Sequence, residues 1–217
     1  WEMAIKEVIG GTEQPDFVGG MVHGDEVTTS IAFMVDGKIY TDVTKLTGLS
    51  CKEFKIFRNS DVYRCGTLEL DDKLNITAGT KIATHYTDYT YKNGELIINQ
   101  DLKWLVDTTC NYSIMAMLGV RRTSETNFIQ ISNKGFRVGE GIVYDCSVAG
   151  FNNALNDSLN GCKKGYLWND GTVSNNSGWD CSFSAEVLEE TQLEGKNFKV
   201  SNNDSYNKMY FGYCKEG

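Results

Sequence analysis

Two histidines, His23 and His85, are the side chains of this 217-residue chain best suited to acid–base or metal chemistry near neutral pH. His85 lies in a β-type run over residues 81–91, where strand alternation places it on one face with Tyr89 and Tyr91. This row is too polar for the core of a sandwich. Aromatic rings offer apolar faces to sugar C–H groups, and imidazole hydrogen-bonds to hydroxyls and carboxylates. The pattern predicts a face that binds a polysaccharide or surface glycan, with a plain solvated face as the alternative.

The same face has the groups that a β-elimination reaction on a uronate needs. Such an enzyme requires a base and an acid, often His and Tyr, and a cation or amide that neutralises the carboxylate. If the protein is a lyase, His85 and Tyr89 are the candidate base and acid, and Arg121 is the candidate cation. An enzyme on the same scaffold is therefore a second functional hypothesis.

Two short segments carry a resemblance that bears on this hypothesis. Residues 121–125, Arg-Arg-Thr-Ser-Glu, and residues 128–131, Phe-Ile-Gln-Ile, are similar to the Arg-Ser-Glu and Gln-Ile-His elements of jelly-roll polysaccharide lyases. The resemblance implies catalysis by β-elimination. The chain departs from that family because Ser132 stands where the second element has its His, and because a late Tyr-x-Lys-x-Gly-x-Tyr motif is missing.

A second candidate site lies in residues 19–26, Gly-Gly-Met-Val-His-Gly-Asp-Glu. His23 and Glu26 are three residues apart, and imidazole with carboxylate suits Zn²⁺. The segment resembles the Gly-Gly-x-His-Gly-x-Glu segment of zinc carboxypeptidases and aspartoacylase-type hydrolases, with one extra residue before the His. That resemblance implies a zinc hydrolase with a further His ligand. We predict no cofactor, with zinc or calcium at His23 and Glu26 as the alternative; a loop with a tight glycine turn explains the segment equally well.

The elements that must position these residues are short β-type runs separated by Gly, Asn and Asp. Asp36-Gly37 and Asn93-Gly94 each predict a two-residue hairpin turn. Helical patterns are scarce, and the single proline, Pro15, leaves later strands uninterrupted. The spacing of the runs predicts an all-β fold, a two-sheet antiparallel sandwich of jelly-roll or concanavalin-like type with very little helix.

The length suits a single sandwich domain over residues 1–217, since all-β sandwiches of roughly 200–250 residues fold as one. Residues 1–20 are expected to form an entry segment. Residues 150–178 are rich in Asn and Gly and predict long loops, which often carry function. Trp168 and Trp179 lie there and are further candidates for ligand binding.

Composition narrows the range of partners. A net charge of −8 and a pI near 4.8 argue against nucleic acid, which is bound by clustered Lys and Arg. No apolar run reaches the ~20 residues that span a bilayer, so we expect no membrane insertion. Residues 19–26, 184–189 and 206–211 resemble segments of phage tail and bacterial surface proteins. The resemblance implies an extracellular or virion-associated module of a larger polypeptide or assembly that recognises a glycan, with a purely structural virion module as the alternative.

Overall fold

The structure, a computed structural model, describes residues 3–121, 135–138, 142–144, 164–168, 182–186, 198–202 and 206–214. In this part of the chain, antiparallel strands form almost all of the regular structure, and the helical segments α1 (Gly20–His23) and η1 (Val43–Leu46) have four residues each. The prediction of an all-β, antiparallel, sandwich-like fold with very little helix is confirmed. None of the described helices is long and apolar enough to cross a membrane.

The chain separates into two compact units. One unit comprises residues 1–5 and 110–217, and the other comprises residues 6–109. A single domain over residues 1–217 stays a prediction. Both histidines and Glu26 belong to the 6–109 unit, which is therefore the part that matters most for the candidate site.

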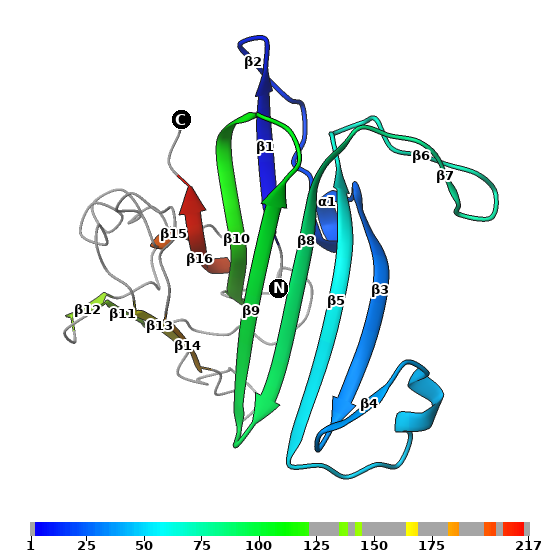
Figure 1. The fold of residues 1–217 in the computed structure, drawn as a ribbon. Helices are drawn as coiled ribbons and strands as arrows, with labels where there is room; N and C mark the ends of the chain where they lie inside the picture. Colours follow the sequence, from blue (N-terminus) through cyan, green and yellow to red (C-terminus); the bar gives the residue numbers. More distant parts are fainter. Residues whose placement is uncertain are drawn as a thin grey trace, which may run out of the picture. The chain divides into compact units, whose positions relative to one another are not determined.

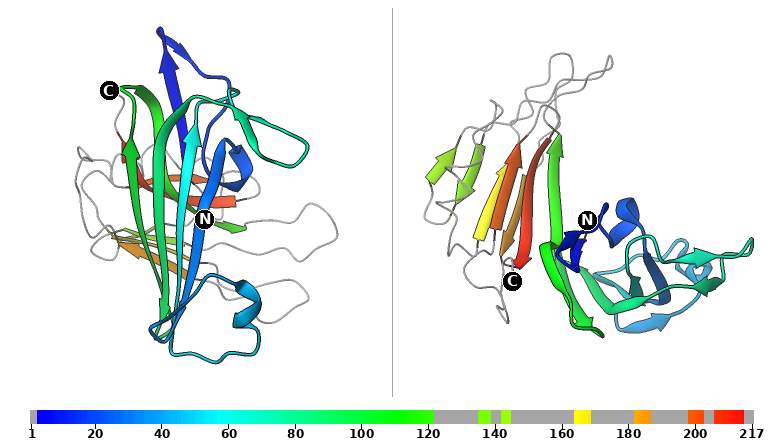
Figure 2. Two further views of the ribbon diagram at one scale, coloured as in Figure 1. Left: turned by 45° about the vertical axis from the view of Figure 1, so that its right-hand side comes forward. Right: turned by 90° about the horizontal axis from the view of Figure 1, so that it is seen from above.

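The 6–109 unit is built around a five-stranded antiparallel sheet (Figure 1). The strands follow the order β4–β3–β5–β8–β9, and the sheet has the usual twist (Figure 2). Their bounds are Glu26–Val35 (β3), Lys38–Tyr40 (β4), Glu53–Tyr63 (β5), Lys81–Lys92 (β8) and Glu95–Trp104 (β9).

Two hairpins of this sheet turn where the sequence predicts. Asp36-Gly37 connects β3 to β4 with φ of 47° and 86°, and Asn93-Gly94 connects β8 to β9 with φ of 55° and 81°. Positive φ at both central residues gives a turn whose twist matches that of the flanking strands, and Gly adopts such angles without strain. Both hairpin predictions are confirmed.

Strand register divides the sheet into two chemically different faces. One face is mostly polar and includes Asn59, Tyr86 and Asp101, which are in register with one another. We call the other one the His85 face, and its side chains, strand by strand, are Glu26, Thr28, Ile31, Phe33 and Val35 (β3), Phe54, Ile56, Arg58, Ser60 and Val62 (β5), Ala83, His85, Thr87, Tyr89 and Tyr91 (β8), and Leu96, Ile98, Gln100, Leu102 and Trp104 (β9).

Burial changes along the His85 face. His85 and Thr87 are 2% and 0% exposed, whereas Tyr91, nearer the β8–β9 turn, is 51% exposed. The expectation that this row is too polar for an interior does not hold for His85 and Thr87, because Glu26 on β3 is a partner of one His85 ring nitrogen and the Thr87 hydroxyl is a partner of the other. Tyr91 is the exposed member of this row.

Glu7 ties strand β1 (Ala4–Ile9) to two distant segments of the 6–109 unit. Its carboxylate is 1% exposed and accepts two hydrogen bonds from Arg64, each of 3.2 Å. The Thr108 hydroxyl donates a third, of 2.7 Å. The contacts of Glu7 with Arg64 and Thr108 therefore fix β1 to the end of β5 and to the segment that follows β9. Strand β1 also pairs with the short strand β2 (Thr12–Glu13).

The other unit contains two antiparallel sheets among the residues described. The first contains β15, β16 and β10 in that order. The second has the order β12–β11–β13–β14. The bounds are Thr109–Arg121 (β10), Gly135–Val138 (β11), Ile142–Tyr144 (β12), Lys164–Trp168 (β13), Ser182–Glu186 (β14), Phe198–Asn202 (β15) and Tyr206–Cys214 (β16).

Candidate functional site

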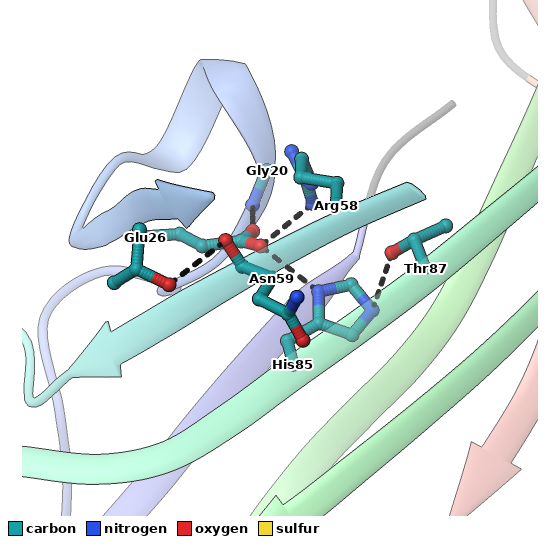
Figure 3. Close-up of polar contacts among 7 residues, drawn as sticks. Gly20, Glu26, Arg58, Asn59, His85 and Thr87 are labelled. Atoms are coloured by element: carbon teal, nitrogen blue, oxygen red, sulfur yellow. Dashed lines mark hydrogen bonds and ion pairs between the residues drawn. The ribbon is translucent and has the colours of Figure 1, made fainter. Parts of the chain in front are cut away.

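The carboxylate of Glu26 is the centre of a buried polar network on the His85 face (Figure 3). Glu26 opens β3 directly after the glycine-rich turn of α1, and its side chain is 2% exposed. Its Oε2 accepts a hydrogen bond of 2.7 Å from the Gly20 backbone N–H. Its Oε1 accepts from Arg58 Nη2 at 2.7 Å and lies 2.9 Å from His85 Nδ1. One carboxylate therefore joins α1, β3, β5 and β8.

The surroundings of Glu26 keep it ionised. Burial by itself would raise its pKa, but the hydrogen bonds from His85 and Gly20, together with the charges of His85 and Arg58, outweigh burial. The net effect lowers the pKa of Glu26 from 4.5 to about 2. Glu26 is thus a fully charged acceptor over the physiological pH range.

His85 has partners at both ring nitrogens. Since Glu26 is ionised, the Nδ1 proton points to Glu26, and Nε2 lies 3.3 Å from the Thr87 hydroxyl. The Thr87–His85–Glu26 order matches the connectivity of a hydroxyl nucleophile, its base and an orienting carboxylate. The His85 and Thr87 side chains are buried, however, so this series of contacts holds β3 and β8 together rather than facing a substrate.

An aromatic and aliphatic surface adjoins the network on the same face. Tyr89 is in register with Ile56 and Ile98, and Tyr91 is in register with Phe54 and Leu96. Leu96 is 60% exposed, so this end of the face is open. On the same face, Phe33 of β3 and Phe54 of β5 stack their rings with centroids 6.2 Å apart.

Tyr89 joins the aromatic surface to the network. Burial raises its pKa, an effect that the Glu26 charge reinforces and that Arg58 and a hydrogen bond with Thr87 oppose. The phenol therefore remains protonated at neutral pH and keeps a hydroxyl that both donates and accepts.

Three buried polar atoms of the described residues have no hydrogen-bond partner, and all three belong to the His85 face. They are Arg58 Nε, Ser60 Oγ and Gln100 Nε2. Arg58 and Gln100 flank Thr87 in register, and Ser60 is in register with His85. Buried donors are nearly always paired in folded proteins, so three unpaired ones on one face mark a place where an acceptor would be stabilised.

Of the residues singled out from the sequence, Glu26, His85, Tyr89 and Tyr91 share the His85 face. His23 ends α1, where Nδ1 lies 3.7 Å from Asp16 Oδ1 and the ring lies 5.0 Å from that of Phe17. The part of the chain that the structure describes contains no group of three or more His, Cys, Asp or Glu that would hold a metal ion. Zinc or calcium at His23 and Glu26 would need ligands from elsewhere.

The remaining candidates belong to the other unit. Arg121 is the last residue of β10, and Trp168 is the last residue of β13, in register with Gly135 and Ser182. Trp179 lies outside the described residues. Their participation in a site with His85 stays a prediction.

Sequence reasoning missed Arg58, Ser60 and Gln100. The signal for Arg58 was available, because alternation over the run 52–58 places it on one face with Phe54 and Ile56, where a charge is unexpected. Ser60 and Gln100 required the register of three strands. Comparisons of the chain with protein families, with curated proteins and with solved structures find no match, so these residues rest on the geometry alone.

Proposed function

We propose that the protein binds a carbohydrate on the open end of the His85 face. The observation that carries the proposal is the placement of Tyr89 and Tyr91 on one face of β8, with Tyr91 half exposed and the stacked pair Phe33–Phe54 on the same face. Tyrosines two residues apart on a strand are separated by roughly 6.8 Å, a spacing suited to a pyranose ring. The rings would contact sugar C–H groups, as aromatic faces commonly do.

The unpaired donors at the inner end of this surface would supply the polar part of recognition after a movement of the side chains that bury them. Arg58 and Gln100 each have a buried nitrogen without a partner, one strand to either side of β8. Both nitrogens carry hydrogens and accept nothing, so they favour hydroxyl, carbonyl or carboxylate oxygens. Arg58 is in register with Thr87, four residues or roughly 14 Å along β8 from Tyr91, so an oligosaccharide rather than a single sugar would be needed to contact both parts of the surface.

Binding agrees better with the geometry than catalysis by His85 does. A base must have a free nitrogen within reach of the proton that it removes. Both nitrogens of His85 are engaged, by Glu26 and Thr87, and its side chain is 1% exposed. A lyase or hydrolase therefore remains an alternative that requires the network to open.

A glycan array is the first experiment, with oligosaccharides of uronic acids and of neutral hexoses, followed by calorimetric titration of the best soluble ligand. Tyr91→Ala is expected to weaken binding about tenfold, which corresponds to about 1.4 kcal/mol. The matched control is Tyr86→Ala, because Tyr86 lies on the opposite face of the same strand. The absence of any bound glycan, or equal loss in both variants, would contradict the proposal.

The proposal also concerns where the protein acts. Polysaccharides and surface glycans are met outside the cell, so we expect an extracellular or virion-associated module such as part of a phage tail or surface protein. A fluorescently labelled protein should bind to cells that carry the glycan found on the array. Loss of this binding after enzymatic removal of the glycan is the expected result, and unchanged binding would speak against it.

A further inference from the structure

A short two-stranded arm leaves the end of the main sheet. We call residues 67–80 the arm; it contains β6 (Glu69–Leu70) and β7 (Ile76–Ala78), and it projects beyond β5 and β8 (Figure 1). Its base is fixed, because Arg64 N–H donates to Thr80 O at 2.8 Å and Thr80 N–H donates to Thr67 Oγ1 at 3.0 Å. The arm is therefore anchored to the sheet.

The tip of the arm is equally well fixed. Asp71 Oδ1 accepts hydrogen bonds from the Lys73 and Asn75 backbone N–H groups at 2.8 and 2.7 Å, and its Oδ2 accepts one from Asn75 Nδ2 at 2.9 Å. Leu74 is held at φ 64°, an angle that costs free energy in a residue with a Cβ. The turn presents this leucine in one fixed conformation, with 76% of it exposed.

The arm displays apolar side chains next to acidic ones. Leu70 and Ile76 are 45% and 40% exposed, in addition to Leu74. Three acidic residues, Glu69, Asp71 and Asp72, stand in the arm against the single lysine Lys73. Ordered apolar side chains that remain in water mark a surface for a protein partner.

The other end of the same sheet has the complementary character. We call residues 38–52 the basic segment; it contains β4 and η1. Three large apolar side chains are exposed there, Ile39 by 64%, Val43 by 61% and Leu49 by 46%. Its charged residues are three lysines and one aspartate, namely Lys38, Lys45, Lys52 and Asp42.

We infer that the arm of one molecule docks onto the basic segment of a second copy of this chain. Opposite charges and exposed apolar side chains suit the two surfaces to each other. They cannot meet within one molecule, because the basic segment precedes β5 and the arm follows it, and 11 extended residues span about 35 Å. A contact between two different surfaces of the same chain is heterologous, so it continues from copy to copy as a chain or a ring.

Sedimentation velocity over a range of concentrations tests this inference on the full chain. The wild type is expected to form oligomers that grow with concentration. Leu74→Asn removes the exposed apolar side chain of the arm, and Val43→Asn removes one of the basic segment, without changing the charge of either surface; each variant alone should be monomeric. Leu105→Asn is the matched control, because Leu105 is 48% exposed and lies outside both surfaces, and it should assemble like the wild type.

An equimolar mixture of Leu74→Asn and Val43→Asn distinguishes head-to-tail docking from other modes. The first variant keeps an intact basic segment and the second keeps an intact arm, so the mixture should form dimers and nothing larger. Circular dichroism and glycan binding establish that both variants are folded. A monomeric wild type, loss of assembly with one variant only, or a mixture that stays monomeric would overturn the inference.

Discussion

Glu26 Oε1 and His85 Nδ1 lie 2.9 Å apart and form a hydrogen bond in the interior of the 6–109 unit. Glu26 is the first residue of β3, and His85 lies near the middle of β8. The same carboxylate binds Arg58 and the Gly20 backbone, so a single ionised group holds three strands and a turn in place. This arrangement fixes the position of the aromatic surface beside it. It also explains how a polar side chain, His85, is accommodated in the interior.

Glu26→Gln should destabilise the protein strongly. The substitution keeps the size of the side chain but removes the charge that compensates Arg58, and breaking a buried pair in this way costs about 3–5 kcal/mol. Urea unfolding followed by circular dichroism measures the change in the free energy of unfolding. Asp61→Asn is the control, because Asp61 pairs with Lys81 at 2.7 Å in a partly exposed position and should cost less than about 1 kcal/mol. Equal effects in the two variants would contradict the central role of Glu26.

Stability should fall in acid in a way that depends on Glu26. Its pKa is lowered in the folded state, from 4.5 to about 2, so the folded protein holds this carboxylate in its ionised form more strongly than the unfolded chain does. The stability that Glu26 contributes is fully present above pH 4.5 and is lost as the pH falls toward 2. Urea unfolding between pH 2 and pH 6 should therefore show a steeper decline for the wild type than for Glu26→Gln. Parallel curves would show that Glu26 is not the group responsible.

Ser60→Ala should not destabilise the protein. The Ser60 hydroxyl is buried without a partner, so its removal is expected to leave the free energy of unfolding unchanged or to raise it by up to about 1 kcal/mol. Thr87→Ala, on the same face, removes a hydroxyl paired with His85 and should lower stability by about 1 kcal/mol. Thermal unfolding of both variants checks the contrast. Clear destabilisation by Ser60→Ala would mean that its hydroxyl has a structural partner.

Gly79→Ala should loosen the base of the arm. A Cβ at this position would lie 2.6 Å from Cδ1 of Tyr63, a residue that is only 7% exposed, so the ring must move. Such overpacking typically costs about 1–3 kcal/mol. Gly94→Ala is the comparison, since an added Cβ there meets no neighbouring atom and only the positive φ opposes it. A Gly79→Ala variant as stable as the wild type would show that the contact with Tyr63 is readily relieved.

The part of the fold set by local chemistry was accessible from the sequence. Asp36-Gly37 and Asn93-Gly94 specify their turns by themselves, because only a few residue types tolerate two successive positive φ angles. Alternation along β8 likewise placed His85, Tyr89 and Tyr91 on one face. These features depend on neighbours in sequence, which is why composition and spacing suffice to predict them.

The site itself depended on contacts across the chain. Glu26 was considered as a partner of His23 in sequence, whereas its hydrogen bonds are with His85, 59 residues away, and with Arg58. Strand order and register decide such pairings, and neither follows from alternation within one strand. Burial of His85 also escaped prediction, because it depends on a partner from β3, Glu26, which alternation along β8 does not reveal.

Nuclear magnetic resonance titration of the labelled protein with the best oligosaccharide from the array tests the central claim most directly. Binding on the His85 face predicts that amide and side-chain signals of Tyr89, Tyr91, Leu96 and Ile98 shift in proportion to bound ligand, while those of Tyr86 on the opposite face stay in place. Shifts confined to the opposite face, or to residues outside the 6–109 unit, would contradict the claim.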